Sequence, residues 1–423
     1  MEVIGTFLAG AALAAGVFAI ALLLTRRRDT PYLELDPDRF PPISDGIEML
    51  SGLTQSSLHE NNTGRVLQNG AAYPAMLADI ENARHSVHLE TFVWSTGELE
   101  HRFVEILSAR ARAGGCEVRV LLDAIGASRA DPRALDAMRE AGVEVTIYCR
   151  PRWWNWLRFN HRTHRKLLVV DGRIGWTFGH GIADQWLGDG TDPDHWRDTA
   201  IRLEGPIVHA LQSVFVENWV EELHRLPAGN GCWPTLDKAG HARAHVVSSA
   251  SGESVSSVAM LYTIAIASAR REVLIQNPYF APDDGVVDLF AMMVERGVDV
   301  QLMVPGKHTD SPFVRRAGCH LYEKLLRAGV RIFEFEPTLL HQKIVIVDEL
   351  WAHVGSTNFD SRSLALNEEV GVGILDAGIA SELKDAYLAD MEHCRELDLD
   401  RWLERSAIAR LVDRFAYLLH DQL

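Results

Sequence analysis

The chain is 423 residues long and acidic, with 47% hydrophobic residues, 24% charged residues and a formal net charge of -16. This length is enough for two domains or two large lobes, and the composition is typical of a globular protein and excludes a disordered one. The negative charge argues against non-specific binding of nucleic acids, because their phosphates need a basic surface, but it leaves room for an anionic lipid at a locally basic site.

The cysteines are scattered along the chain and form no Cys-x-x-Cys pair. This spacing argues against a zinc site and against a disulfide framework, and it fits a reducing compartment. The chain offers no other convincing metal cluster, so we expect no metal and no cofactor. The five cysteines are Cys116, Cys149, Cys232, Cys319 and Cys394.

An uncharged segment opens the chain. Residues 3–24 contain no charged side chain, and Arg26, Arg27 and Arg28 follow almost directly. A helix of this length spans the roughly 30 Å hydrocarbon core of a bilayer. We expect a transmembrane helix with its basic stop over residues 1–28 rather than a cleaved signal peptide, because no basic region precedes the apolar run. The positive-inside rule then places the rest of the chain on the cytoplasmic side.

The next residues, 29–64, are rich in Pro, Asp, Ser and Asn, which predicts a linker or arm. Beyond them the chain repeats itself, with a helix start and three strand-like segments in the same order in both copies. The matched segments are 75–80 and 259–264, 87–92 and 273–278, 117–123 and 299–305, and 141–148 and 328–335.

Strands that alternate with helices in this way indicate an α/β fold. We predict two similar lobes, 65–226 and 246–423, each a mixed β-sheet flanked by helices. A stretch that contains Pro and Gly predicts a linker between the lobes over 227–245. Duplication of one lobe explains the repeated order of segments.

Between residues 150 and 162 the first lobe has a loop that the second lobe lacks. Tryptophan and arginine side chains suit a lipid headgroup interface, where rings lie at the membrane boundary and guanidinium groups meet phosphates. An ordinary packed loop with Arg stacked on Trp is the alternative, and the N-terminal anchor favours membrane contact. The candidate residues are Arg150, Arg152, Trp153, Trp154, Trp156 and Arg158.

The strongest pattern is His-x-Lys-x4-Asp, which occurs twice. The first copy is His164, Lys166 and Asp171, and the second is His341, Lys343 and Asp348. In each copy an apolar run precedes the Asp and predicts a β-strand that carries His and Lys on one face. A nucleophile or proton carrier beside a fixed positive charge suits phosphoryl chemistry. These residues could instead simply begin buried strands, but two chance matches in one chain are rare.

At the C-terminus, apolar residues recur at helical spacing with charged residues between them. This pattern predicts a helix that packs against the second lobe rather than one that enters a membrane. The apolar positions are Ile408, Leu411, Val412, Phe415, Leu418 and Leu419.

With Gly355-Ser356-Thr357-Asn358 after the second motif, the chain resembles the phospholipase D superfamily and, within it, bacterial cardiolipin synthases. Segments 276–282, 305–311, 340–343 and 358–363 carry the closer likeness, which covers roughly residues 65 to 423. The resemblance implies a pseudo-two-fold arrangement in which both histidines face one pocket.

The same resemblance implies roles for individual residues. His164 would be the nucleophile and His341 the acid and base, while Lys166 and Lys343 would neutralise the phosphate. Ser356 and Asn358 would contact the phosphate, and the carboxylates Asp198 and Glu369 would orient the histidines. Asp171 and Asp348 belong to the catalytic motif, although we expect them to brace the fold.

The first copy departs from the family pattern. Where Gly-Ser or Gly-Gly and then Asn are expected, the chain has Phe178-Gly179-His180-Gly181. Gly181 stands in place of the Asn, so one polar contact to the phosphate is missing. His180 either replaces that contact or has a structural role.

The resemblance implies a membrane-bound phosphatidyltransferase that makes cardiolipin from two phosphatidylglycerol molecules through a phosphohistidine and releases glycerol. A phospholipase D or another headgroup transferase is the first alternative, and a superfamily nuclease or an inactive lipid-binding scaffold is less favoured. We expect an anionic phospholipid and the lipid bilayer as partners, no nucleic acid, and a single-pass location in the bacterial inner membrane with the catalytic part in the cytoplasm.

Overall fold

The computed structural model describes residues 10, 13, 16–18, 36–150, 162–229, 231–249 and 256–418. The chain forms two units, residues 1–33 and 34–423. Of the predicted anchor, only residues 10, 13 and 16–18 belong to the described part, and they are helical; the others lie outside it. Among the described residues, no helix is both long and apolar enough to cross a membrane.

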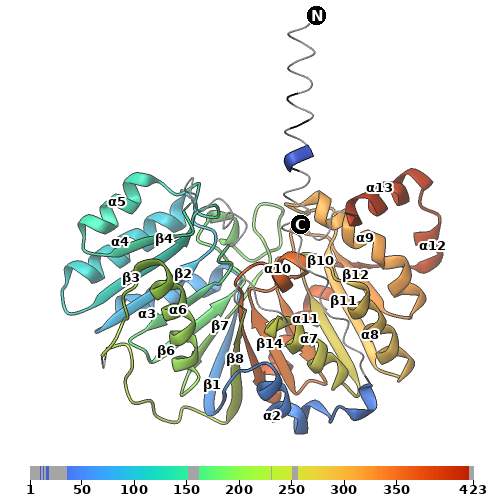
Figure 1. Ribbon diagram of the computed structural model, residues 1–423, viewed down its shortest axis with the longest axis horizontal. Helices are drawn as coiled ribbons and strands as arrows, with labels where there is room; N and C mark the ends of the chain where they lie inside the picture. The colour runs from blue at the N-terminus through green and yellow to red at the C-terminus, as the bar shows by residue number, and fades with distance from the viewer. Residues whose placement is uncertain are drawn as a thin grey trace, which may run out of the picture. The chain divides into compact units, whose positions relative to one another are not determined.

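The second unit is built around one mixed sheet of fifteen strands (Figure 1). Its centre is the antiparallel pair β1 (Leu58–Gln68) and β8 (Ala242–Ser248). Outward from β1 the order is β7, β6, β5, β2, β3, β4; outward from β8 it is β16, β14, β13, β9, β11, β12 and finally β17. Each strand of the first half thus has a counterpart in the second, which adds β17 at its edge. This order confirms the mixed α/β fold and shows that both halves share one sheet.

In each half three strands are parallel and the others antiparallel. The strands of the first half are β7 (Thr199–Glu204), β6 (Ile174–Phe178), β5 (Leu167–Val170), β2 (Ser86–Thr91), β3 (Glu117–Asp123) and β4 (Glu144–Tyr148). Those of the second half are β16 (Val370–Leu375), β14 (Trp351–Gly355), β13 (Ile344–Val347), β9 (Glu272–Gln276), β11 (Asp299–Pro305), β12 (Arg331–Phe335) and β17 (Cys394–Glu396).

The motif strands β5 and β13 consist of Leu-Leu-Val-Val and Ile-Val-Ile-Val, and every residue in them is buried. Such runs suit strands that are covered on both faces. Alternate residues of β5 enter different cores, because side chains of a strand point to opposite faces: Leu168 and Val170 contribute to one core, and Leu167 and Val169 to another.

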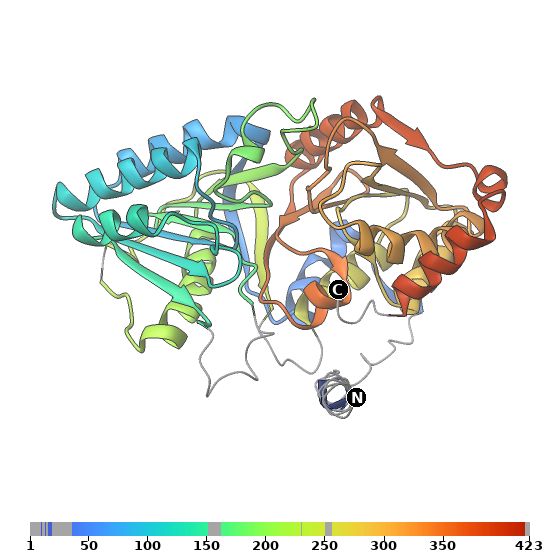
Figure 2. The ribbon, with the colours of Figure 1, turned by 90° about the horizontal axis from the view of Figure 1, so that it is seen from above.

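Helices cover both faces of the sheet (Figures 1 and 2). The outer helices are α3 (Ala72–Glu81), α4 (Glu98–Arg112) and α5 (Pro132–Glu140) in the first half, and α7 (Ser257–Ala267), α8 (Asp284–Glu295) and α9 (Pro312–Arg327) in the second. On the opposite face, α6 (Val208–Leu223) and α11 (Ala377–Met391) share a single core that takes residues from both halves, including Ile201 and Val372. This common core joins the halves into one body.

The structure differs from the two predicted linkers. Within the arm predicted over 29–64, α2 (Ile43–Leu53) buries Ile43, Ile47 and Leu50, and strand β1 begins at Leu58. Within the linker predicted over 227–245, strand β8 begins at Ala242. Both central strands were therefore assigned to linkers.

The polar composition of β1 explains the difference. Asn62 is buried at a shift of register, where its side chain donates to the Ala242 carbonyl at 3.2 Å and accepts from the Ile207 N–H at 2.8 Å. A side chain typical of a loop thus serves as a bridge between strands.

At the C-terminus, α12 (Leu399–Leu403) and α13 (Ala407–Tyr417) follow the last strand. The predicted helix is present as α13 and packs on α9. However, it packs through Asp413 and Ala416, and the described residues of its apolar face are exposed, whereas Leu419 lies outside the described part. The expectation that this apolar face packs against the second half was wrong.

Candidate active site

Each motif is hydrogen-bonded to a segment of the other half. The His164 N–H donates to the Glu368 carbonyl at 2.8 Å, and the Glu368 N–H donates to the Arg162 carbonyl at 3.0 Å. In the same way, the His341 N–H donates to the Arg197 carbonyl at 2.7 Å. The residue after Glu368 and the residue after Arg197 are the predicted carboxylates, so these backbone contacts fix each carboxylate beside the opposite motif.

The two carboxylates are exchanged between the halves. Glu369 of the second half lies 2.9 Å from Nδ1 of His164, and Asp198 of the first half lies 2.7 Å from Nδ1 of His341. Both carboxylates are fully buried. An ionised carboxylate can only accept, so Nδ1 carries the proton in each ring and Nε2 keeps its lone pair, which in His341 lies beside Lys343 Nζ.

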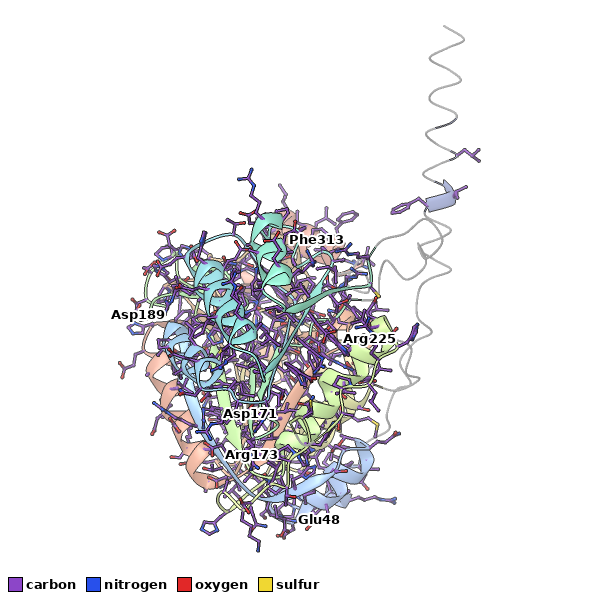
Figure 3. All side chains as sticks on the ribbon, turned by 90° about the vertical axis from the view of Figure 1, so that its left-hand side faces the viewer. Glu48, Asp171, Arg173, Asp189, Arg225 and Phe313 are labelled. Atoms are coloured by element: carbon purple, nitrogen blue, oxygen red, sulfur yellow. The ribbon has the colours of Figure 1, made fainter. Side chains whose placement is uncertain are left out.

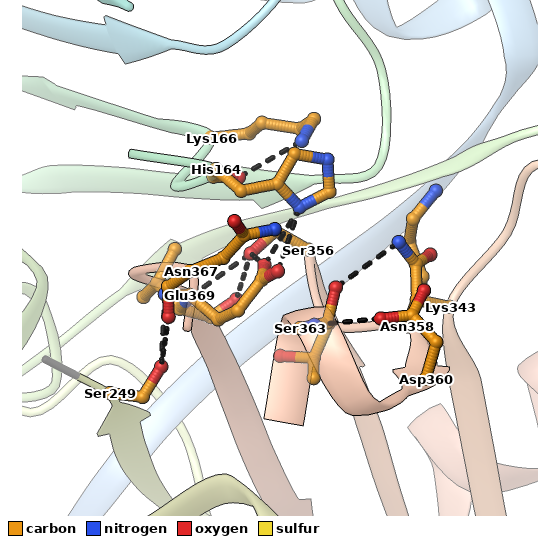
Figure 4. A network of polar contacts seen from close by, with 12 residues as sticks. His164, Lys166, Ser249, Lys343, Ser356, Asn358, Asp360, Ser363, Asn367 and Glu369 are labelled. Atoms are coloured by element: carbon orange, nitrogen blue, oxygen red, sulfur yellow. Dashed lines mark hydrogen bonds and ion pairs between the residues drawn. The ribbon is translucent and has the colours of Figure 1, made fainter. Parts of the chain in front are cut away.

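The two lysines lie beside the histidines and are buried as well. Lys166 Nζ donates to the His164 carbonyl at 2.9 Å, and Lys343 Nζ lies 3.1 Å from His341 Nε2. Figure 4 shows Lys166 and Lys343, one from each half, together with the hydrogen bonds around His164. Burial lowers the pKa of Lys166 to about 7 and that of Lys343 to about 8, although Glu369 and Asp198 favour their charged forms.

Burial also keeps both histidines neutral in the free site. It lowers the pKa of His164 to about 4, and the nearby lysines act in the same direction. The pKa of His341 is well below its ordinary value because of burial, and Lys166 and His164 of the other half lower it further. The two motifs therefore act on each other through one shared, buried site that is cationic at its lysines.

This arrangement suits a phosphodiester. Neutral His164 or His341 can attack phosphorus through Nε2, and the lysines can neutralise the non-bridging oxygens. The negative charge of the bound phosphate favours protonation of the second histidine, which can then protonate the leaving oxygen. These four side chains have the chemistry that a two-step transfer through a phosphohistidine requires.

The carboxylates receive a second hydrogen bond from different donors. Ser356 Oγ donates to Glu369 Oε2 at 2.5 Å, whereas the indole N–H of Trp186 donates to Asp198 Oδ2 at 3.1 Å. Gly179 occupies the position equivalent to Ser356, and a Cβ there would collide with the Asp198 carboxylate. Of the two residues predicted to bind phosphate, Ser356 therefore supports Glu369.

The departure at Gly181 has a steric cause. A Cβ on Gly181 would lie 2.6 Å from Val93 Cβ and 2.7 Å from a ring carbon of Trp186. In the second half the equivalent Asn358 donates to Ser363 at 3.3 Å, and Ser363 stands five residues later, as Trp186 does after Gly181. The first half has thus exchanged an Asn and Ser pair for a Gly and Trp pair.

His180 is buried and packs edge-on against Tyr73, with ring centroids 5.5 Å apart. This packing favours the structural role over the replacement of a phosphate contact.

The two motif aspartates lie away from the histidines and lysines. Asp171 accepts hydrogen bonds from the backbone N–H groups of 84–86, at 2.7 to 3.1 Å. Asp348 does the same for the N–H groups of 270–272. Each brings together the end of a motif strand and the start of the neighbouring antiparallel strand, β2 or β9. The structure therefore gathers His164, Lys166, His341 and Lys343 in the site and gives Asp171 and Asp348 bracing positions.

Sequence reasoning missed the residues that hold the carboxylate segments. Asn69 directly follows β1 and accepts from the Asp198 N–H at 3.0 Å; Ser249 directly follows β8 and accepts from the Glu369 N–H at 3.1 Å. A correct assignment of the two central strands would have revealed this equivalence. Trp186 was missed because nothing in its local sequence links it to Asp198.

Of the predicted headgroup loop, Arg150 is described and exposed at the end of β4. The other five candidates, Arg152, Trp153, Trp154, Trp156 and Arg158, lie outside the described residues. Within the described part of the chain, no group of three or more His, Cys, Asp or Glu side chains is placed to hold a metal ion.

Comparison with known proteins agrees with the geometry. The model of a family described as "Cardiolipin synthase, PLD-like domain" matches residues 76–186 and 262–391. Cardiolipin synthase A of Pseudomonas aeruginosa is 35% identical over 368 residues, which cover 86% of this chain and 74% of that protein. The major cardiolipin synthase of Bacillus subtilis is 32% identical over 380 residues, or 89% of this chain and 78% of that one.

Among solved structures, a phosphatidylserine synthase of Haemophilus influenzae has a similar fold, with a TM-score of 0.66 at 12% identity. The match covers 89% of this chain and 98% of that one. The family match and the identities together are decisive: the chain belongs to the cardiolipin synthase family of phospholipase D-like proteins.

Proposed function

We propose that the protein is a cardiolipin synthase that transfers a phosphatidyl group from one phosphatidylglycerol to another. His164 Nε2 attacks the phosphorus of the donor and forms a P–N bond, while the P–O bond to glycerol breaks. Protonated His341 gives its proton to the departing glycerol oxygen. His341 then takes the proton of a hydroxyl of the second phosphatidylglycerol, whose oxygen attacks phosphorus and breaks the P–N bond.

The observation that carries this proposal is the exchanged pair of carboxylates. Glu369 and Asp198 orient His164 and His341 in one buried site that also holds Lys166 and Lys343. An active site built from one half alone could not place a carboxylate of one half beside the histidine of the other. The relatives named cardiolipin synthase, at 32% to 35% identity over most of the chain, support the choice of substrate.

The same proposal includes a membrane location. We infer a single transmembrane helix over the uncharged residues 3–24, followed by Arg26, Arg27 and Arg28 on the cytoplasmic side of the bacterial inner membrane. The tryptophans and arginines between 150 and 158 would then meet lipid headgroups. The helix and the loop would together hold the active site next to a lipid substrate that stays in the bilayer.

Product analysis tests the proposal. Purified full-length protein reconstituted in phosphatidylglycerol vesicles should release glycerol and form cardiolipin in equal amounts. His164→Ala and His341→Ala should abolish turnover, whereas His101→Ala, at an exposed position on α4, should not change it. Phosphatidic acid as the main product would identify a lipase instead, and normal turnover in either motif variant would refute the shared site.

A further inference from the structure

Helix α13 turns its apolar side chains away from the rest of the protein. Four of them are more than half exposed: Ile408 at 76%, Leu411 at 68%, Phe415 at 60% and Leu418, just after the helix, at 70%. Val412 is 46% exposed. Their spacing of three and four residues places all five on one stripe of the helix. In Figures 1 and 2, α13 lies beside α12 at the outer edge of the second half.

The opposite side of α13 fixes the helix in place. Asp413 is buried and accepts from Arg316 at 3.2 Å and from Arg405 at 2.8 Å. Ala416 packs against Ala281 and Ala317. These contacts are specific and well formed, so the outward direction of the apolar stripe is built into the fold.

The exposed charged side chains of α13 are all positive. Arg410 and Arg414 are exposed beside the apolar stripe, and Asp413, the single acidic residue of the helix, is buried against two arginines. The chain as a whole has a net charge of -16. This helix therefore presents an apolar and cationic surface on an otherwise acidic protein. Phe313, one turn before Ala317 at the start of the neighbouring α9, is 37% exposed (Figure 3).

We propose that α13 lies in the surface of an anionic phospholipid bilayer, with its apolar stripe against the acyl chains and Arg410 and Arg414 at the lipid phosphates. Helices that bind to bilayer surfaces combine a wide apolar face with flanking cations in this manner. A second copy of the chain is a poorer occupant, because two such stripes would bring four arginines together without an exposed carboxylate on either helix.

This contact would lie close to the catalytic site. Ala416 packs on Ala281 of β10 (Phe280–Ala281), and β10 pairs with β15 (Phe359–Asp360), which directly follows Asn358. A bilayer bound by α13 would therefore border the second half of the site. The proposal concerns binding and stands whether or not the protein makes cardiolipin.

A fluorescent label on the stripe tests the proposal. In the full-length protein with Cys394→Ser, which removes the one cysteine of the five that is not buried, Leu411→Cys carries an environment-sensitive dye. Glu404→Cys, at an exposed position before α13, is the matched control. The protein is placed in nanodiscs of phosphatidylglycerol and phosphatidylcholine, some of which contain lipids with a nitroxide on the acyl chain.

We expect the dye at position 411 to shift to the blue and to be quenched by the nitroxide, and the dye at 404 to do neither. Arg410→Glu with Arg414→Glu should reduce the quenching at 411, as should nanodiscs of phosphatidylcholine alone. Equal quenching at both positions would overturn the proposal. So would a blue shift at 411 that depends on protein concentration in the absence of lipid, because it would identify a second copy as the occupant.

Discussion

At the scale of single residues, the two motif histidines differ in the groups that hold them. His164 pairs with a glutamate that Ser356 supports, and His341 pairs with an aspartate that Trp186 supports. Trp186 and Trp196 also lie against the His341 ring, with centroids 5.4 and 5.5 Å away. A ring enclosed in this way is held in one orientation, which suits a group that passes a proton back and forth.

A donor that carries p-nitrophenol in place of glycerol should separate the roles of the histidines. Nitrophenolate departs without a proton, so His341→Ala should still release it in a rapid burst as the phosphatidyl group is transferred to His164. His164→Ala should show no burst. Stopped-flow absorbance measures both. Asp198→Asn should behave as His341→Ala does, and Glu369→Gln should lose roughly 10²- to 10⁴-fold in the burst rate. A burst in His164→Ala would reverse the assignment.

The lysines predict how substrate binding depends on pH. Burial lowers the pKa of Lys166 to about 7 and of Lys343 to about 8 in the free site, so both lose their charge as the pH rises through this range. A bound phosphate stabilises the charged lysines, so kcat should change less than KM.

Turnover of phosphatidylglycerol in mixed micelles between pH 6 and pH 9 should therefore show a KM that rises above about pH 7. Lys384→Met, which removes a lysine that pairs with Glu272 and Glu349, should keep this profile. A KM that stays constant to pH 9 would show that the lysines remain charged without substrate.

At the scale of elements, the segments that follow β6 and β14 occupy equivalent positions in the two halves but contain different helices and different side chains. Trp186 ends the short 3-10 helix η4 (Asp184–Trp186), and Ser363 lies in α10 (Ser361–Ala365). A side chain at Gly181 would collide with Trp186 and Val93, and a smaller residue in place of Trp186 would leave a cavity next to Gly181. The missing Asn of the first half is thus one part of a paired exchange.

A double-mutant cycle tests this pairing. Gly181→Asn should lower the free energy of unfolding by about 1–3 kcal/mol through overpacking, and Trp186→Ser should lower it by about 3–5 kcal/mol. Together they should cost at least about 1 kcal/mol less than the sum, because the Asn enters the space that the Trp leaves. Denaturant unfolding gives the values. Gly181→Asn combined with Trp402→Ser on α12 should be additive, and additivity in both pairs would contradict the paired exchange.

The sequence predicted the elements whose pattern is local. The apolar runs of β5 and β13 marked the motif strands, and the spacing of 408–419 marked a helix. It could not show that β1 is a central strand, because Asn62 depends on partners 145 and 180 residues away in addition to the nearby His59 carbonyl. Nor could it show which side of α13 packs, because Arg316 and Arg405 hold the polar side.

For the active site, the sequence identified the histidines, lysines and carboxylates but not their pairing. His164 and Glu369 are separated by 205 residues, and His341 and Asp198 by 143. Only the meeting of the halves determines which carboxylate serves which histidine. The downstream position of each carboxylate, taken by itself, suggests pairing within a half.

At the scale of the whole molecule, the fold buries several neutral histidines. Burial lowers the pKa of five histidines, to about 3 in two of them and to about 4 in the other three. In the opposite sense, burial raises the pKa of Glu90 and of Asp360 to about 7. The five histidines are His88, His353, His164, His180 and His245.

These shifts predict that acid destabilises the protein. As the pH falls from 6.5 toward 4, the unfolded chain takes up a proton at each of these five histidines and at His341, all of which the folded chain leaves neutral. The two carboxyls offset about two of these protons. A net uptake of roughly four protons lowers the free energy of unfolding by about 5 kcal/mol per pH unit.

Urea unfolding at pH 7, 6 and 5 measures this slope. His353→Gln, which removes one of the buried rings, should reduce the slope by about one proton, whereas His101→Gln at an exposed position should not. A midpoint that does not change from pH 7 to pH 5 would contradict the prediction.

The exchange of carboxylates between the halves has a consequence for biosynthesis. A ribosome that adds about 5 to 20 residues per second makes Glu369 roughly 10 to 40 seconds after His164, because 205 residues separate them. During that interval the emerging first half has its histidine without the glutamate, and Asp198 has no His341 to orient. The unfinished chain therefore lacks a complete site, and the proposed transfer can begin only when the strands of the second half join the sheet.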